Sequence, residues 1–250
     1  THRRDGDTEV YFVRNKETTP FHGTATFRAG NRAPELWDPR TGTIAPAGLF
    51  RRTDAGIEVS LTLAPLGSVF VICRGPLPAN SFATVSPTAT LERDGEATRL
   101  VAERSGTYLV TTGAGMRSEV KVPSLPGALM LDSDWTVDFD SPAGSPARLA
   151  LPRVGAWTQS AAPEVKYFAG TAKYRRSFAL PEGWRTHAPR VELDLGRLWA
   201  IGEVWVNGRS LGVVWTPPFR VDCTAALRDG ATELVVAVVG TWHNRLVGEA

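Results

Sequence analysis

Apolar and polar residues alternate one by one through most of this chain, and this alternation restricts its fold more than any other feature. In the segment GIEVSLTL, residues 56–63, every second position from Ile57 to Leu63 is apolar and the positions between are polar. Because successive side chains of a strand point to opposite faces, this pattern predicts a half-buried strand. The same interpretation applies to residues 9–15, 24–29, 67–74, 106–113, 118–122, 135–139, 171–180, 190–195, 202–208, 210–215 and 233–239.

Helical periodicity is not convincing over three turns anywhere in the sequence. The 24 Gly and 18 Pro residues interrupt the strands at the short intervals expected of antiparallel sandwiches. We therefore predict an all-β protein.

Two turn signals support this prediction. Asn207-Gly208 separates two predicted strands, and both residue types tolerate the positive φ angles of a tight hairpin. The segment WDPRTG, residues 37–42, is a second corner, in which Pro39 fixes φ and Gly42 is free to turn left-handed.

A domain boundary is predicted near residue 125. Pro123 and Pro126 bracket a short connector, and a new strand-rich stretch opens after it. We expect a β-sandwich domain over residues 1–124 and a second domain over residues 125–250. The Pro-rich residues 75–87 predict that a small satellite sheet follows the sandwich within the first domain.

Composition excludes several classes of protein. The formal net charge is only +2 and the charges are scattered, so we expect no nucleic-acid partner. No apolar run approaches the ~20 residues that would span a bilayer, so we expect no membrane insertion. Cys73 and Cys223 are too far apart for a C-x-x-C metal site, and we expect two buried free thiols.

Residues with the spacing of a known catalytic or metal motif are not recognisable. The four His residues are isolated, and no nucleophile elbow, zinc motif or phosphate-binding loop occurs. Asp132, Asp134, Asp138 and Asp140 are concentrated in one stretch, which we interpret as a solvated strand edge, with a calcium site as the alternative.

The tryptophans are more informative: the sequence has 8, and Trp157, Trp199, Trp205, Trp215 and Trp242 all lie in the second half. Flat rings stack on the apolar faces of sugars, and neighbouring polar side chains bind the hydroxyls. For Trp157, Trp215 and Trp242 we favour core or domain contact over sugar stacking. We expect Trp205 to point away from Val204 and Val206, as a surface platform or interface residue. Trp199 has no assigned role.

The second half also resembles a known family. It contains VKYFAGTAKYRRSFALP, VNGRSLG, PPFRVD and the closing segment WHNRLVG, a succession that resembles the galactose-binding-like jelly roll of family 2 type glycosidases. The ending is most similar to the C-terminal part of the α-L-rhamnosidases of glycoside hydrolase family 106. HRRDGDTEVYFVRN, APELWDPRTGTI and LAPLGSVFVI in the first half resemble the β-sandwich segments of those enzymes. Glu249 stands where that family usually has Asp.

This resemblance implies a β-sandwich domain followed by a galactose-binding-like β-jelly roll, in the non-catalytic C-terminal region of a secreted or periplasmic hydrolase. The catalytic carboxylates would lie on an N-terminal (β/α)₈ barrel that this chain lacks, so we expect no catalytic residue, no cofactor and no activity here; structural calcium remains an open alternative. Thr1 is expected to be a cut end. The expected partners are that barrel and an oligo- or polysaccharide.

The candidate carbohydrate-binding or domain-contact residues are Trp157, Tyr167, Trp205, Trp215, Arg220, Asp222, Trp242, Asn244 and Arg245. Trp242 is expected to pack at the end of the jelly roll, and Arg245 to pair with a carboxylate such as Asp222 or with carbonyl groups of the barrel. The alternatives are an autonomous carbohydrate-binding or adhesion module and, third, a complete small hydrolase with an unrecognised acid pair.

Overall fold

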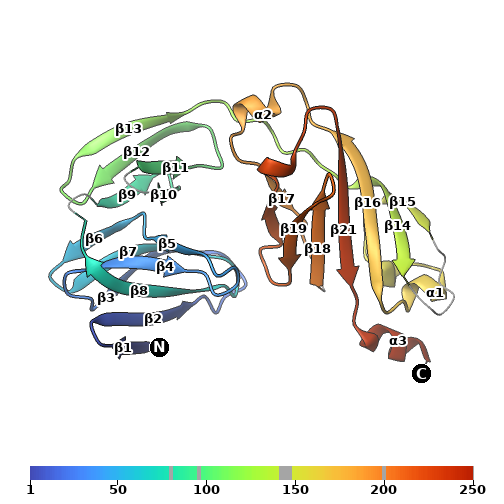
Figure 1. Ribbon diagram of the computed structural model, residues 1–250, viewed down its shortest axis with the longest axis horizontal. Helices are drawn as coiled ribbons and strands as arrows, with labels where there is room; N and C mark the ends of the chain where they lie inside the picture. Colours follow the sequence, from blue (N-terminus) through green and yellow to red (C-terminus); the bar gives the residue numbers. More distant parts are fainter. Residues whose placement is uncertain (79–80, 95–96, 141–147, 199–200, 250) are drawn as a thin grey trace. The chain divides into compact units, whose positions relative to one another are not determined.

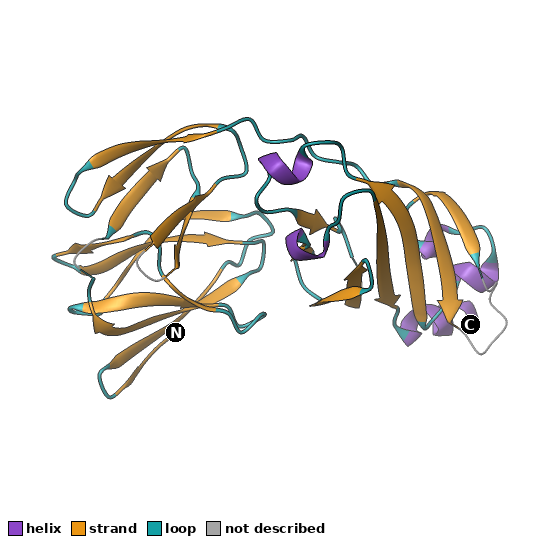
Figure 2. Ribbon diagram, turned by 45° about the horizontal axis from the view of Figure 1, so that its top comes forward, coloured by secondary structure: helices purple, strands orange, loops and turns teal. Residues whose placement is uncertain are grey.

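The computed structural model describes residues 1–250 except 79–80, 95–96, 141–147, 199–200 and 250. Antiparallel strands dominate it, and the helices are short (Figure 2). The predicted all-β class is confirmed. Trp199 lies outside the described residues. None of the helices in the described part of the chain has the length and apolar character needed to cross a membrane.

The chain divides into two compact units, Thr1–Leu125 and Pro126–Ala250. In the first unit, two antiparallel sheets enclose a core that includes Ile57, Val59 and Val71. The five-stranded sheet has the order β1 (His2–Asp5), β2 (Thr8–Arg14), β8 (Ser68–Pro76), β4 (Arg32–Trp37) and β5 (Ile44–Pro46). The three-stranded sheet has the order β3 (Phe21–Phe27), β7 (Gly56–Leu63) and β6 (Phe50–Thr53).

Two smaller sheets complete the first unit. One contains β13 (Arg117–Val122), β12 (Gly106–Thr112) and β9 (Phe82–Ser86), and the other pairs β10 (Thr90–Asp94) with β11 (Ala97–Val101). β9 lies within the Pro-rich stretch, residues 75–87, in which the sequence placed a connector, and the other four strands of these sheets follow it.

The second unit is built on a six-stranded antiparallel sheet (Figure 1). Its order is β15 (Leu149–Arg153), β14 (Ser133–Asp140), β16 (Thr171–Ala179), β21 (Ala231–Val239), β18 (Ile201–Val206) and β19 (Arg209–Val214). A two-stranded sheet pairs β17 (Glu192–Asp194) with β20 (Arg220–Asp222). The short helices are η1 (Trp157–Gln159), α1 (Pro163–Lys166), α2 (Trp184–His187), η2 (Thr224–Ala226) and α3 (Trp242–Glu249).

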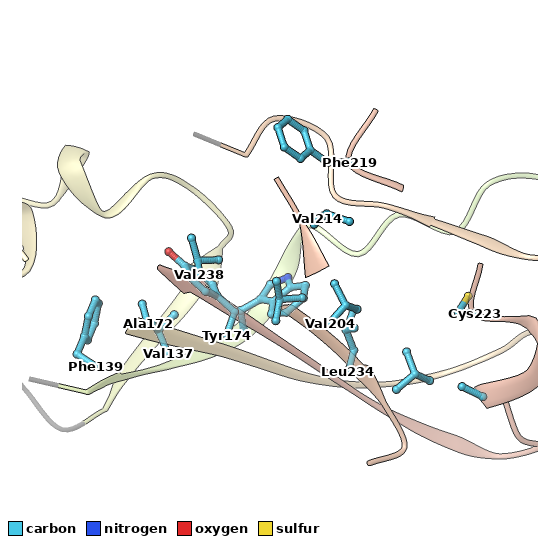
Figure 3. Close-up of a cluster of buried hydrophobic side chains, with 14 of the residues drawn as sticks. Val137, Phe139, Ala172, Tyr174, Val204, Val214, Phe219, Cys223, Leu234 and Val238 are labelled. Carbon is cyan, nitrogen blue, oxygen red and sulfur yellow. The ribbon is translucent and has the colours of Figure 1, made fainter. Parts of the chain in front are cut away.

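The core of this unit follows directly from the alternation in its strands. Val137, Tyr174, Val204 and Val236 all point from the six-stranded sheet into one buried cluster. Figure 3 shows side chains of this cluster, to which the segment around β20 contributes Phe219 and Cys223. Each such apolar side chain stabilises the fold by about 1.5–3 kcal/mol relative to an exposed position.

Both turn predictions are confirmed. Asn207 and Gly208 have φ angles of 51° and 78°, and they join β18 to β19 in a two-residue hairpin. Gly42 has a φ of 72°, and its N–H donates to the carbonyl of Asp38 at 2.9 Å. The two cysteines are free and buried, as expected.

Candidate functional site

The C-terminal segment is held against the second unit by backbone and small-residue contacts. The N–H of Gly240 donates to the carbonyl of Gly170 at 2.9 Å, and a Cβ at position 240 would overlap the ring of Trp157. A Cβ at Gly248 would likewise overlap the ring of Tyr167. Glycine at these two positions therefore lets the chain approach both rings closely.

Asn244 fixes the same segment from its side chain. Its amide nitrogen donates to the carbonyl oxygens of Lys166 at 2.6 Å and Phe168 at 3.2 Å. The structure thus brings together three residues that the sequence singled out: Trp157, Tyr167 and Asn244. Tyr167 and Asn244 attach α3 to the segment that contains α1, and Trp157 lies against Gly240 just before the helix.

Within this chain, the position of Trp242 contradicts the prediction that its ring is packed. We expected its ring to pack at the end of the jelly roll, but it is 75% exposed. The physical reason is the helix: Asn244 and Gly248 occupy the side of α3 that faces the protein, which directs Trp242 away from it. The helix itself was not predicted, because eight residues give little more than two turns of periodic signal.

Trp157 packs within the unit. Its ring lies edge-on to Phe168, with centroids 5.8 Å apart, and parallel to Tyr174 at 6.5 Å. The favoured core interpretation of Trp157 therefore agrees with its surroundings. Trp205 lies on the face of β18 opposite the buried Val204 and Val206, as the alternation predicted.

Trp215 is largely exposed, just after β19 ends. In the small sheet, the Nε of Arg220 donates to Asp194 at 2.8 Å. Asp222, the carboxylate suggested for Arg245, accepts from the N–H of Thr224 at 2.9 Å and lies 3.5 Å from the Nε of Arg190. These candidates therefore come from several elements, and their use in sugar binding stays a prediction.

A cavity of about 1170 Å³ opens beside the core of the second unit. Its lining is mostly apolar and includes the aromatic side chains of Trp135, Trp157, Tyr174 and Trp184. Only Trp157 was singled out from sequence, because positions inside a strand or a four-residue helix gave no signal for the other three. The tryptophan count was the one sequence feature that pointed to such a surface.

The aspartates of β14 lie opposite its buried face. Trp135, Val137 and Phe139 are buried, whereas Asp138 and Asp140 lie on the other side. The prediction of a solvated face is right, but that of a strand edge is wrong, since β14 pairs with β15 on one side and β16 on the other. Among the described residues, no three His, Cys, Asp or Glu side chains are grouped to hold a metal ion.

Among the described residues, three carboxyl groups have pKa values held below their ordinary range, and each accepts a hydrogen bond from an arginine. Hydrogen bonds from Arg51 lower the pKa of Glu58, and those from Arg148 lower the pKa of Asp138. Burial of Glu35 acts in the opposite direction, but hydrogen bonds from a neighbouring arginine and tryptophan outweigh it and lower its pKa. A glycosidase general acid needs a raised pKa, so these three carboxylates have the character of structural ion pairs.

Comparisons with known proteins connect this arrangement to the glycoside hydrolases. The sequence model of glycoside hydrolase family 106, described as alpha-L-rhamnosidase, matches residues 1–51. The structure of a rhamnosidase from Novosphingobium sp. PP1Y is similar over 99% of this chain and 20% of its own, with 31% identity and a TM-score of 0.73. A protein of Formosa agariphila named "Putative beta-glucuronidase" is 31% identical over 172 residues, which is 69% of this chain and 15% of that protein.

The chain is thus similar, over nearly its whole length, to a region of an α-L-rhamnosidase-like glycoside hydrolase. It spans about one fifth of the rhamnosidase and less of the Formosa protein. The resemblance inferred from the sequence motifs is supported at this coarser level.

Proposed function

We propose that this chain is a non-catalytic accessory region of a secreted or periplasmic α-L-rhamnosidase-like hydrolase, in which it supports a (β/α)₈ catalytic barrel of the same polypeptide. The observation that carries the proposal is the match of 99% of this chain to only 20% of a rhamnosidase. The arginine-bound state of Glu35, Glu58 and Asp138 supports a structural role for these acids.

The test compares two proteins on an aryl α-L-rhamnoside. The purified 250-residue chain should release no chromophore, whereas the longer polypeptide read from the gene should contain a barrel of several hundred residues and hydrolyse the substrate. Near-UV circular dichroism checks that the inactive chain is folded. Turnover by the chain alone, abolished by changing a single Asp or Glu, would overturn the proposal.

A second candidate is an autonomous carbohydrate-binding or adhesion module, and the aromatic-lined cavity favours it. Titration of the isolated chain with L-rhamnose, followed by tryptophan fluorescence, measures this directly. Saturable binding, together with a gene that encodes no barrel, would favour the module.

A further inference from the structure

One face of α3 is fixed to the second unit. Asn244 and Gly248 are four residues apart and therefore share a face of the helix. Asn244 donates to the carbonyl oxygens of Lys166 and Phe168, and Gly248 lies against the ring of Tyr167. These contacts set the rotation of α3 about its axis. They therefore also determine which side chains of the helix point away from the unit.

Three large apolar side chains of α3 are exposed. Trp242, Leu246 and Val247 are 75%, 61% and 54% exposed. At about 100° per residue, Trp242 and Leu246 lie roughly 40° apart and far from the inward Asn244. Leaving three large apolar side chains in water on a helix of only eight residues is unusual for a finished surface and is typical of an interaction site.

The sheet also exposes two apolar residues near the start of α3. Ile201 and Val239 are directly opposite each other on β18 and β21, and they are 50% and 44% exposed. They lie at the end of β21 from which the chain passes into α3 (Figure 1). Sheet and helix therefore expose apolar residues at the same end of the unit.

A sugar is not the occupant that this surface fits best. A stacking ring needs polar side chains beside it to bind the hydroxyl groups. Asn244, the amide closest in sequence to Trp242, already donates to two backbone carbonyls. Leu246, which lies one turn further along on the same side of the helix as Trp242, offers no hydrogen bond.

A second copy of this chain is also a poor fit. A stable interface buries about 800 Å² on each partner, whereas three to five partly exposed side chains supply on the order of a few hundred. A domain of the same polypeptide needs less area, because covalent linkage raises its effective concentration. The similar rhamnosidase is about five times the length of this chain, which it matches over 20% of its own residues.

We propose that the exposed apolar side chains of α3, which are Trp242, Leu246 and Val247, form together with Ile201 and Val239 the docking surface for the catalytic domain of the longer polypeptide. This inference rests on the proposed function and names the contact by which the region supports its barrel. The partner is an apolar protein surface rather than a sugar.

The experiment measures amide hydrogen exchange in α3 in two proteins, the 250-residue chain and the longer polypeptide. Amides of α3 should exchange at least about tenfold more slowly in the longer polypeptide. The double variant Trp242→Ala/Leu246→Ala should remove this extra protection and leave exchange in the isolated chain nearly unchanged. Alanine favours helix, so a loss of protection cannot be assigned to weaker helix propensity.

Met116→Ala is the matched control, since Met116 is exposed on the first unit and its change should leave α3 protected in both proteins. Equal exchange of α3 in the two proteins, with an active barrel present, would overturn the docking surface and leave the proposed function standing. A longer polypeptide without a glycosidase domain would overturn both.

Two other outcomes also contradict the proposal. Protection of α3 in the isolated chain by L-rhamnose would make Trp242 a sugar platform. A concentration-dependent dimer of the isolated chain, dissociated by the double variant, would make the surface a contact between copies.

Discussion

Two consecutive arginines of β16 have opposite surroundings. Arg175 lies on the outer face, where its Nε donates to Asp138 at 3.1 Å. Arg176 lies on the inner face, opposite the buried Leu234, and its Nε and one terminal nitrogen are buried with no hydrogen-bond partner among the described residues. Buried donors that are left unpaired destabilise the folded state.

Replacing Arg176 should therefore not weaken the fold. We expect Arg176→Met to raise the free energy of unfolding by ~1 to ~3 kcal/mol, because methionine fills a similar space without the unpaired donors. Arg175→Met is the control and should cost up to ~1 kcal/mol, the value of an exposed ion pair. Urea unfolding measures both variants. A clear destabilisation by Arg176→Met would show that this guanidinium has a partner that the protein needs.

At the scale of elements, the hairpin between β18 and β19 depends on one side chain. The Asn207 amide donates to the carbonyl of Ala226 at 2.8 Å and its oxygen accepts from the N–H of Glu233 at 3.0 Å. The turn is thereby bonded to η2 and to β21, and the positive φ of Asn207 suits this residue type.

Asn207→Ala should lower the free energy of unfolding by ~2 to ~4 kcal/mol, since it removes two hydrogen bonds and strains the backbone. Asn207→Gly restores the backbone freedom alone and should lose about half as much. Chemical unfolding of the two variants separates the contributions. Equal losses would mean that the positive φ contributes nothing.

The attachment of α3 depends on a glycine at position 248, because a residue with a Cβ there would overlap the ring of Tyr167. Gly248→Ala should push the helix from Tyr167 and speed amide exchange in α3 by roughly tenfold, equivalent to ~1.4 kcal/mol. Gly155→Ala, where a Cβ meets nothing within 4 Å, should leave α3 unchanged. Combining Gly248→Ala with Tyr167→Ala should restore part of the protection. Unchanged exchange in Gly248→Ala would refute the close approach.

At the scale of the whole molecule, the two units have separate cores, and each contains one buried thiol. Cys73 belongs to the core of the first unit and Cys223 to that of the second. Burial raises the pKa of both thiols to about 11. Thiol labelling therefore reports the opening of each unit separately.

We expect Leu234→Ala to destabilise the second unit by ~2 to ~5 kcal/mol, because Leu234 is almost fully buried. Labelling at pH 8 in moderate urea should then reach Cys223 while Cys73 stays protected. Val71→Ala, in the other core, is the mirror control and should expose Cys73 first. Simultaneous labelling of both thiols in each variant would contradict independent unfolding.

The raised pKa values of the two thiols predict that the free energy of unfolding falls as the pH rises. The thiols stay neutral in the folded protein up to about pH 11, but ionise near their ordinary values once unfolded. The stability they contribute is thus fully present below pH ~8.5 and is lost as the pH rises through the folded value. Melting temperatures measured from pH 8 to pH 11 should fall, and should fall less in a Cys73→Ala/Cys223→Ala variant.

The sequence alone determined the strands, the hairpin at Asn207 and the buried thiols, because alternation and turn chemistry are local properties of the chain. It did not determine α3 or the exposure of Trp242. An eight-residue helix is marginal by itself and depends on tertiary contacts such as those of Asn244 and Gly248. Those contacts join residues more than 70 positions apart, so only the folded chain decided which side of the segment WHNRLVG is exposed.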